Sequence, residues 1–222
     1  MPGIDQYTKL LLHCNGADAS TTFIDSATGK AITAVETAQV DTAQSKFGGA
    51  SLLLDGNSDI LTTPDHADFT TGSSDFTVDC WIKRAAAGVT HGICMFNVTS
   101  IGLGFYVFSN NLLCAIIRKD PTNYSANSTG TIGTDWTHVA FVRDGNTLRL
   151  FINGTADGTK DVTGITADDP TGVAMIGKYS TFFFNGWIDE FRVSKGIARW
   201  TANFTPPTSA YSRPSGFLPF FM

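Results

Sequence analysis

One acidic pair, Asp189-Glu190 in the segment NGWIDEFRV (185–193), stands in a strand-like context where acid–base chemistry could occur. Hydrolysis of a glycosidic bond needs two carboxylates on one face of a cleft, roughly 5–10 Å apart. Adjacent residues of a regular strand point to opposite faces, so this pair is not expected to flank one bond. The four histidines, at positions 13, 66, 91 and 138, lie in strand or turn contexts, and the chain has no GxSxG elbow. The sequence therefore predicts a protein that is not an enzyme.

A second group of candidate ligands is the run DGNSD (55–59), in which Asp55, Asn57 and Asp59 have the spacing that begins an EF-hand loop. That loop requires glycine at its sixth position and glutamate at its twelfth, but this chain has Ile60 and His66 there. We interpret the run as a turn between two strands.

Aromatic residues in loop-like or strand-like segments could form a platform for a sugar, because sugar sites combine aromatic rings with a few polar groups in a groove. The run of three phenylalanines at 182–184 is unusual for a loop. Its alternative interpretation is a hairpin packed on the core or on a neighbouring subunit. The candidate carbohydrate-binding residues are Tyr106, Tyr124, Tyr179 and Phe182.

The elements that would position these residues are strands. TKLLLHC (8–14), ASLLLDG (50–56) and FTVDCWIK (76–83) are short apolar runs bounded by turn-forming residues. The segments 137–143 and 147–153 flank Asp144-Gly145-Asn146, which is the strongest local hairpin signal in the chain. Helical periodicity is not sustained over ten residues, although SKGIARW (194–200) could form a single turn.

The alternation of FTVDCWIK predicts one core face and one mixed face. Phe76, Val78, Cys80 and Ile82 share the first face. The second face contains polar residues such as Asp79, and we expect it to be partly exposed. Many short strands separated by turn signals predict an all-β, antiparallel, two-sheet jelly-roll sandwich over residues 1–212.

Composition limits the classes of function. The chain has 222 residues, a formal net charge of −5 and a pI near 5.2, without the Lys/Arg clusters that nucleic-acid binding needs. No apolar run reaches the length of a membrane helix, and the N-terminal residues lack the pattern of a signal peptide, so we expect neither. Cys14, Cys80, Cys94 and Cys114 match no zinc motif and are interpreted as buried apolar residues, with a disulfide as the alternative in an exported protein.

Five segments in order resemble the laminin-G-like and concanavalin A-like jelly rolls of phage and marine bacterial proteins. These segments are LLLHCNGADASTTFIDSATG, AQSKFGGASLLLDGNSDILTTPDHADF, SSDFTVDCWIK, DWTHVAFVRDGNTLRLFINGT and NGWIDEFRVSKGIARWTANFTPPTSAY, together covering about residues 8–211. The resemblance implies that IDEFRV is the last core strand and lies near the first one. It also implies that GIARWTANFTPP wraps the outside of the sandwich, with Trp200 and Phe204 as anchors.

The same resemblance implies a structural calcium ion where the first and last strands meet. The matching residues here are Asn15, Asp25 and Asp189, with the Gly48-Gly49 carbonyls as neighbours. Asn15 stands where the family commonly has Asp, which removes one formal charge. The alternative is that Asp25 opens a turn and Asp189 caps the end of a strand.

The last residues, 213–222, form an apolar tail. Exposed apolar surface at a chain end is typical of a contact with a partner or with a second copy, and the alternative is that the tail folds back on its own sandwich. The candidate assembly residues are Phe217, Leu218, Phe220 and Phe221.

The function hypothesis that follows is a non-catalytic structural or surface protein of a virion. It would act as capsid decoration, tail fibre or baseplate component, with other virion proteins or further copies of itself as partners and possibly with host cell-surface glycans. The alternative is a carbohydrate-binding module of a bacterial extracellular protein, and a glycoside hydrolase is the third hypothesis.

Overall fold

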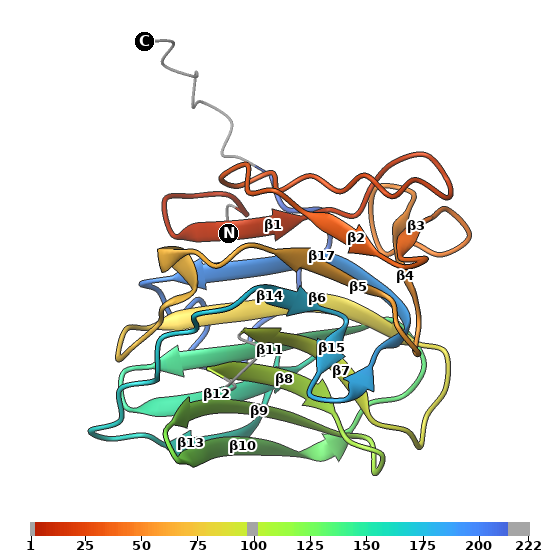
Figure 1. Cartoon of the computed structure of the whole chain (residues 1–222). Helices are drawn as coiled ribbons and strands as arrows, with labels where there is room; N and C mark the ends of the chain where they lie inside the picture. The colour runs from red at the N-terminus through yellow and green to blue at the C-terminus, as the bar shows by residue number, and fades with distance from the viewer. Residues whose placement is uncertain (1–2, 97–101, 213–222) are drawn as a thin grey trace, which may run out of the picture.

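The structure is a computed structural model that describes residues 3–96 and 102–212. Strands form two antiparallel sheets stacked face to face (Figure 1). In sheet A the order is β13 (Thr155–Asp161), β12 (Thr147–Ile152), β11 (Thr137–Asp144), β6 (Phe76–Arg84), β17 (Asn185–Lys195), β4 (Ser51–Asp55) and β3 (Gln39–Asp41), with β1 (Thr8–Leu12) also paired to β17. The predicted all-β sandwich is confirmed.

Sheet B covers one face of sheet A. Its order is β10 (Thr122–Thr131), β9 (Leu112–Lys119), β8 (Leu103–Val107), β7 (His91–Phe96), β14 (Ala174–Ile176), β5 (Ile60–Thr63) and β2 (Thr33–Val35). A small hairpin of β15 (Lys178–Tyr179) and β16 (Phe182–Phe183) lies outside both sheets. The described residues contain one helical turn, η1 (Ala67–Phe69), so the turn expected within 194–200 does not form.

The core lies between the sheets and follows the alternation of the strands. In β6 the predicted inward residues, such as Phe76 and Cys80, belong to one large apolar cluster with residues of β9, β11 and β17. The hairpin predicted at Asp144-Gly145-Asn146 is confirmed, because Asp144 pairs with Thr147 and Gly145 has a φ of +56°. All four cysteines are buried and unpaired, as expected for small apolar core residues.

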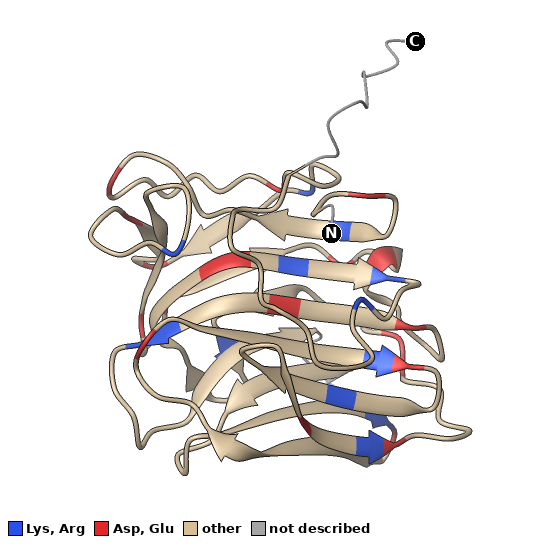
Figure 2. Ribbon diagram, turned by 180° about the vertical axis from the view of Figure 1, so that it is seen from behind, with Lys and Arg blue, Asp and Glu red and all other residues tan. Residues whose placement is uncertain are grey.

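The second face of β6 is not exposed, contrary to expectation. Two segments cover it: residues 3–7, and an irregular stretch after β17, residues 197–211, which we call the strap. Seen from behind in Figure 2, irregular chain crosses the strands of sheet A. Trp200 of the strap packs with Ala140, Val142 and Phe151 on this outer face. Asp79 is consequently fully buried.

β17 is the centre of sheet A. One of its edges pairs with β6 along most of its length, while the other edge pairs first with β4 and then with β1. A bulge interrupts the strand between Asp189 and Arg192, where the partner changes. Glu190 within the bulge has a φ of +51°.

Candidate functional site

One hollow of about 480 Å³ lies at an end of the sandwich, where three loops from distant parts of the sequence meet. The turn between β4 and β5, the loop before β7 and the β15–β16 hairpin form its walls. We call it the hairpin hollow, and it is lined by Gly56, Asn57, Val89, Thr90, His91, Thr181, Phe182, Phe183 and Asn185.

Glycines allow the walls of the hairpin hollow to approach each other. A Cβ at Gly92 of β7 would lie 2.0 Å from the Tyr179 amide nitrogen, so only glycine lets the hairpin rest on this strand. Gly56 has a φ of +79°, and a Cβ there would lie 2.5 Å from the Cβ of Asn185. The Asn185 side chain therefore lies directly against the β4–β5 turn.

The lining combines exposed apolar surface with polar side chains. Phe182 is 45% exposed and Val89 is 49% exposed, and both belong to the small set of exposed large apolar residues. Asn57 and Asn185 are exposed beside them. Among the described residues, neither amide side chain has a hydrogen-bond partner. The hollow thus presents an apolar ring next to free amide groups.

His91 forms the floor of the hairpin hollow and is fully buried. Its Nδ1 accepts a hydrogen bond from the Asn185 amide at 3.2 Å, so its Nε2–H donates to the Ala86 carbonyl at 3.0 Å. Burial lowers the pKa of His91. These contacts fix one neutral tautomer, which makes the residue a structural support rather than a proton donor to a ligand.

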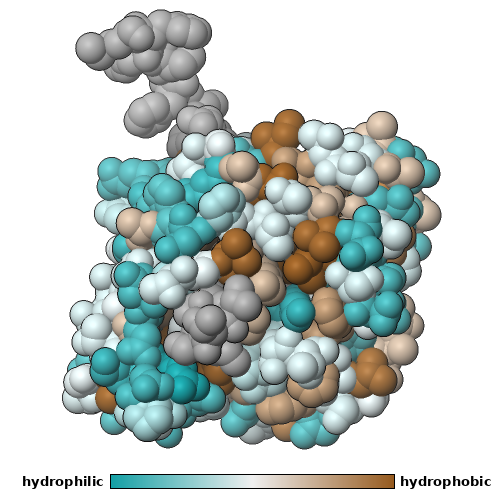
Figure 3. Space-filling view, viewed as in Figure 1, coloured by the Kyte–Doolittle hydropathy of each residue, from teal (hydrophilic) through white to brown (hydrophobic). Residues whose placement is uncertain are grey.

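The other predicted sugar-binding aromatics are arranged differently. Tyr106 and Tyr179 stack with 3.8 Å between ring centroids, and Tyr106 is only 6% exposed, so one ring face of each is covered by the other. Tyr124 packs against the core between the sheets and is paired with Ile117. Of the four candidates, Phe182 alone lines the hairpin hollow. Figure 3 shows that the face bearing sheet B is mostly hydrophilic, with separate apolar patches.

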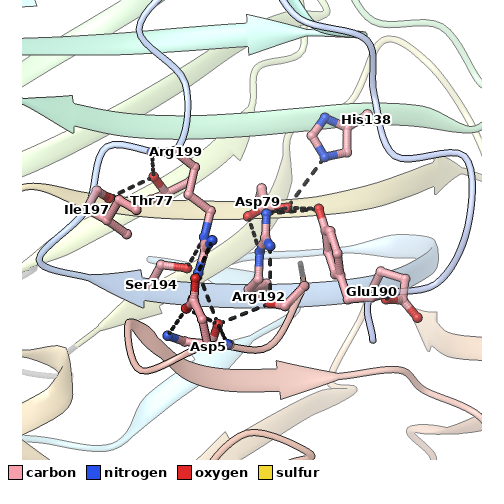
Figure 4. Close-up of polar contacts among 12 residues, drawn as sticks. Asp5, Thr77, Asp79, His138, Glu190, Arg192, Ser194, Ile197 and Arg199 are labelled. Atoms are coloured by element: carbon pink, nitrogen blue, oxygen red, sulfur yellow. Dashed lines mark hydrogen bonds and ion pairs between the residues drawn. The ribbon is translucent and has the colours of Figure 1, made fainter. Parts of the chain in front are cut away.

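A buried polar network beneath the strap was not anticipated from the sequence. Asp79 of β6 accepts hydrogen bonds from the Arg192 guanidinium at 2.9 and 3.2 Å and from the Tyr211 hydroxyl at 2.5 Å (Figure 4). Burial alone would raise the pKa of Asp79, but the Arg192 charge and neighbouring His138 lower it to about 2. Arg199 makes a second ion pair with Asp5, at 2.8 Å. Because these groups join the strap, the N-terminal segment and sheet A, the network has a structural role.

A hollow of about 320 Å³ lies under the strap, between Arg192, Arg199, Trp200 and residues 205–212. Both guanidinium groups already have carboxylate partners in the network. This hollow therefore offers no free charge to a ligand.

The Asp189-Glu190 pair differs from the sequence-based interpretation. Ile188 and Phe191 both belong to the core, so the bulge places two residues where a regular strand has one outward residue. Asp189 and Glu190 consequently do not alternate between faces, and that prediction is wrong because tertiary pairing breaks the strand. Both are nevertheless buried: Asp189 accepts the Lys46, Phe47 and Glu190 amides, and Glu190 contacts His13 at 2.7 Å.

Asp189 has a perturbed acidity. Burial raises its pKa to about 7, and the amide hydrogen bonds of Phe47 and Lys46 oppose the rise. Since its oxygens face three backbone amides, the carboxyl group stabilises the junction of β4, β17 and β1. It does not face a cleft in which a substrate could bind.

The residues proposed to bind calcium do not fit one shared ion. Asp25 pairs with Leu12 on the edge of β1 opposite to β17, so β1 separates it from Asp189. Its carboxylate accepts the amides of Leu11, Ala27, Thr28 and Lys30. Asn15 lies against Gly48 instead. Oxygens that face amide hydrogens are poor cation ligands, and calcium binding stays a prediction that has no part in the proposed function.

The DGNSD run forms the turn that the sequence predicted. Asp55 closes β4 and accepts the amides of Asn57, Ser58 and Asp59. Asp59 turns inward and accepts the amide and hydroxyl of Thr37. The predicted assembly residues of the tail, Phe217, Leu218, Phe220 and Phe221, lie outside the described residues.

The His13–Glu190 pair predicts a pH-dependent contribution to stability. The hydrogen bond to Glu190 raises the pKa of His13 above its ordinary value of 6.5. A raised pKa means that the stabilisation is fully present below about pH 6.5 and is lost as the pH rises through the folded-state pKa. We expect His13→Gln to lower the free energy of unfolding by about 1–2 kcal/mol at pH 5.5 and by much less at pH 9. Urea unfolding of both proteins at the two pH values measures this, and an equal loss at both would contradict it.

In the described part of the chain, no helix is long and apolar enough to cross a membrane. Lys and Arg are interspersed with Asp and Glu on the face seen in Figure 2, without a continuous basic area. This distribution agrees with the absence of a nucleic-acid footprint in the composition.

Comparison with solved structures gives the same architecture in clostridial toxins. The binding domain of botulinum neurotoxin serotype D superimposes with a TM-score of 0.67 at 14% identity, and that of botulinum neurotoxin DC in complex with SialylT with 0.65 at 14%. A botulinum neurotoxin type C structure, whose title reports cell entry dependent upon two ganglioside molecules, gives 0.63 at 15%. The alignments cover 86% of this chain and 48–49% of those chains, so it spans about half their length.

At these identities the likeness to the toxin domains is one of fold alone. No curated protein sequence matches the chain. Family comparison of the sequence gives a match over residues 55–199 to the Concanavalin A-like lectin/glucanases superfamily. This range runs from the end of β4 through β17 into the strap, and so includes most strands of both sheets. Because the match covers more than half of the 222 residues, the chain belongs to the concanavalin A-like lectin/glucanase superfamily.

Proposed function

We propose that the chain is a non-catalytic carbohydrate-binding module and that the hairpin hollow binds the glycan. The observation on which the proposal rests is the exposed ring of Phe182 beside the free amides of Asn57 and Asn185. The volume of about 480 Å³ lies in the range of small-ligand sites.

The chemistry of this lining suits a sugar. One face of a pyranose ring has several C–H groups and can stack on an aromatic side chain, while its hydroxyls need donors and acceptors at the rim. Each asparagine amide offers two N–H donors and one carbonyl acceptor. Thr90 and Thr181 add hydroxyls to the same lining.

Binding without turnover is favoured over hydrolysis. Neither of the two hollows has an Asp or Glu in its lining, among the residues that the structure describes. A glycosidase needs two carboxylates flanking the scissile bond. Asp189 and Glu190, the acidic pair on β17, are buried with their oxygens occupied by amides and by His13.

The fold supports the same proposal by analogy. The superfamily is named for lectins and glucanases, and the structurally similar toxin domains are titled as binding domains, two of them with a sialylated or ganglioside ligand. A virion setting and a phage origin have no support in these comparisons, so the virion hypothesis stays a prediction of the sequence, and the extracellular carbohydrate-binding alternative is the one we adopt.

Phe182→Ala tests the proposal. A glycan array first identifies a ligand, and titration calorimetry then compares the variant with the original protein. Loss of the ring is expected to weaken binding at least about tenfold, since an aromatic contact in a binding site contributes on the order of 1–3 kcal/mol. The melting temperature should change little because Phe182 is 45% exposed.

Phe108→Ala is the matched control. Phe108 is 37% exposed and packs on Tyr106, outside the hairpin hollow. It should leave affinity unchanged. Absence of any glycan ligand would refute the proposed function, and loss of binding in Phe108→Ala alone would move the site to the Tyr106–Tyr179 surface.

A further inference from the structure

The hairpin hollow contains no formal charge of its own. Among the described residues, none that lines it is Asp, Glu, Lys or Arg. Its one titratable side chain is His91, whose Nδ1 accepts the Asn185 amide while its Nε2–H donates to the Ala86 carbonyl. Protonation of Nδ1 would place a hydrogen against the Asn185 N–H, so the ring stays neutral.

A negative charge lies next to this lining. Asp55 directly precedes Gly56 and Asn57, and in the pairing of β4 with β17 it is the partner of Asn185. Burial alone would raise the pKa of Asp55, but the amide hydrogen bonds of Asn57, Ser58 and Asp59 lower it. This carboxylate is therefore ionised at neutral pH, one residue away from the amides that would contact a ligand.

A compensating cation is not part of the lining. Lys178, on the hairpin itself, has its ammonium 4.4 Å from the centroid of the Phe183 ring, and Lys178 is not a lining residue. A carboxylate or sulfate entering the hollow would lose its hydration and meet neutral amides and the field of Asp55. Removing an anion from water without a charged partner is unfavourable by several kcal/mol.

We infer that the hairpin hollow selects a neutral sugar and discriminates against sialylated, uronic and sulfated ones. This inference rests on the proposed function and narrows its ligand class. The apolar face of a neutral pyranose would lie on Phe182, and its hydroxyls would bond to Asn57 and Asn185. Specificity comes from the unfavourable placement of an anion as much as from the contacts with the neutral ring.

An array of matched glycan pairs tests the inference with the full chain. Each neutral oligosaccharide is printed beside the same core with one charge added, such as lactose beside 3′-sialyllactose and cellotetraose beside its C6-carboxyl derivative. In 20 mM salt, the neutral member of every bound pair is expected to bind at least tenfold more tightly. The difference should narrow in 500 mM salt, because the Debye length falls to a few Å.

Asp55→Asn separates the electrostatic cause from shape. The amide keeps an oxygen that can accept the turn hydrogen bonds, and the charge is lost. We expect this variant to bind the anionic member several-fold more tightly than the original protein does, with neutral binding unchanged, while Lys178→Ala should change neither. Unaltered discrimination in Asp55→Asn at low salt would overturn the role of Asp55.

The outcomes distinguish the inference from the proposed function. If anionic members bind as tightly as neutral ones, and Phe182→Ala abolishes that binding, the module binds glycans but the inferred selectivity is wrong. If neutral glycans bind and Phe182→Ala does not weaken them, the hollow is not the site and the inference fails. If no glycan of either class binds, the proposed function fails and the inference fails with it.

Discussion

Replacing Arg192 by Met is expected to lower the free energy of unfolding by about 3–5 kcal/mol, because the change leaves the fully buried Asp79 without its ionic partner. The guanidinium also donates to the Gly3 carbonyl and the Tyr211 hydroxyl, so the N-terminal segment and the strap lose contacts as well. His138 does not replace it, since its Nε2 lies 3.5 Å from Asp79. Urea unfolding followed by Trp fluorescence measures the loss.

Arg149→Met is the matched control. Arg149 pairs with Asp144 at 3.1 Å, and the two side chains are 28% and 33% exposed, so the same substitution should cost below about 1 kcal/mol. Combining Arg192→Met with Asp79→Asn should restore part of the stability, because the unpaired carboxylate is then removed. Similar losses in Arg192→Met and Arg149→Met would show that the buried pair has no special weight.

Replacing Trp200 by Ala is expected to cost about 3–5 kcal/mol, the usual range for deleting a buried indole. Trp200 is 7% exposed, stacks on Phe204 with 4.0 Å between centroids and covers the ring of His138. The strap should detach before the sandwich unfolds, because this residue anchors it to the outer face of sheet A. Trypsin should therefore cleave after Lys195 or Arg199 much faster than in the original protein.

Phe182→Ala serves as the comparison, since it also removes an aromatic ring but one that is 45% exposed. It should change stability by less than about 1 kcal/mol. A Trp200→Ala protein with unchanged urea midpoint and unchanged trypsin resistance would contradict the anchoring role of the strap.

The parts of the fold that depend on local signals were predictable. The Asp144-Gly145-Asn146 turn specifies its hairpin through Gly145, and the alternation of β6 identifies its core face without knowledge of the partners. The strap was predicted only through the family resemblance. Trp200 and Phe204 are indeed the residues that attach it, as their stacking shows.

The features that depend on tertiary context could not be predicted. Asp79 looks like a solvent-facing strand residue until residues 3–7 and the strap are known to cover it. The bulge at Glu190 arises because β17 changes its partner from β4 to β1 at that point, and no local motif announces such a change. Strand parity alone likewise could not place Tyr124 on the core side and Tyr106 on the outer side.

The candidate site was only partly accessible for the same reason. Phe182 was identified as an unusual exposed aromatic, but Asn57, Val89 and Asn185 join it only through the register of β4 with β17 and the support of the hairpin by Gly92. Each of these residues is unremarkable in its own segment. Only the assembled sheets bring them to one end of the sandwich.

The position of β17 has a consequence for biosynthesis. The strand at the centre of sheet A is the last of the described strands to leave the ribosome, and β1, β4 and β6 all await it as a partner. Until Lys195 has emerged, these earlier strands have unpaired edges, which are prone to aggregate or to bind chaperones. Because Thr8 must find Ser194 across nearly the whole chain, closure of sheet A has a high contact order and is expected to be slow. Synthesis of this module thus ends with its central strand, so its folding is post-translational in its decisive step.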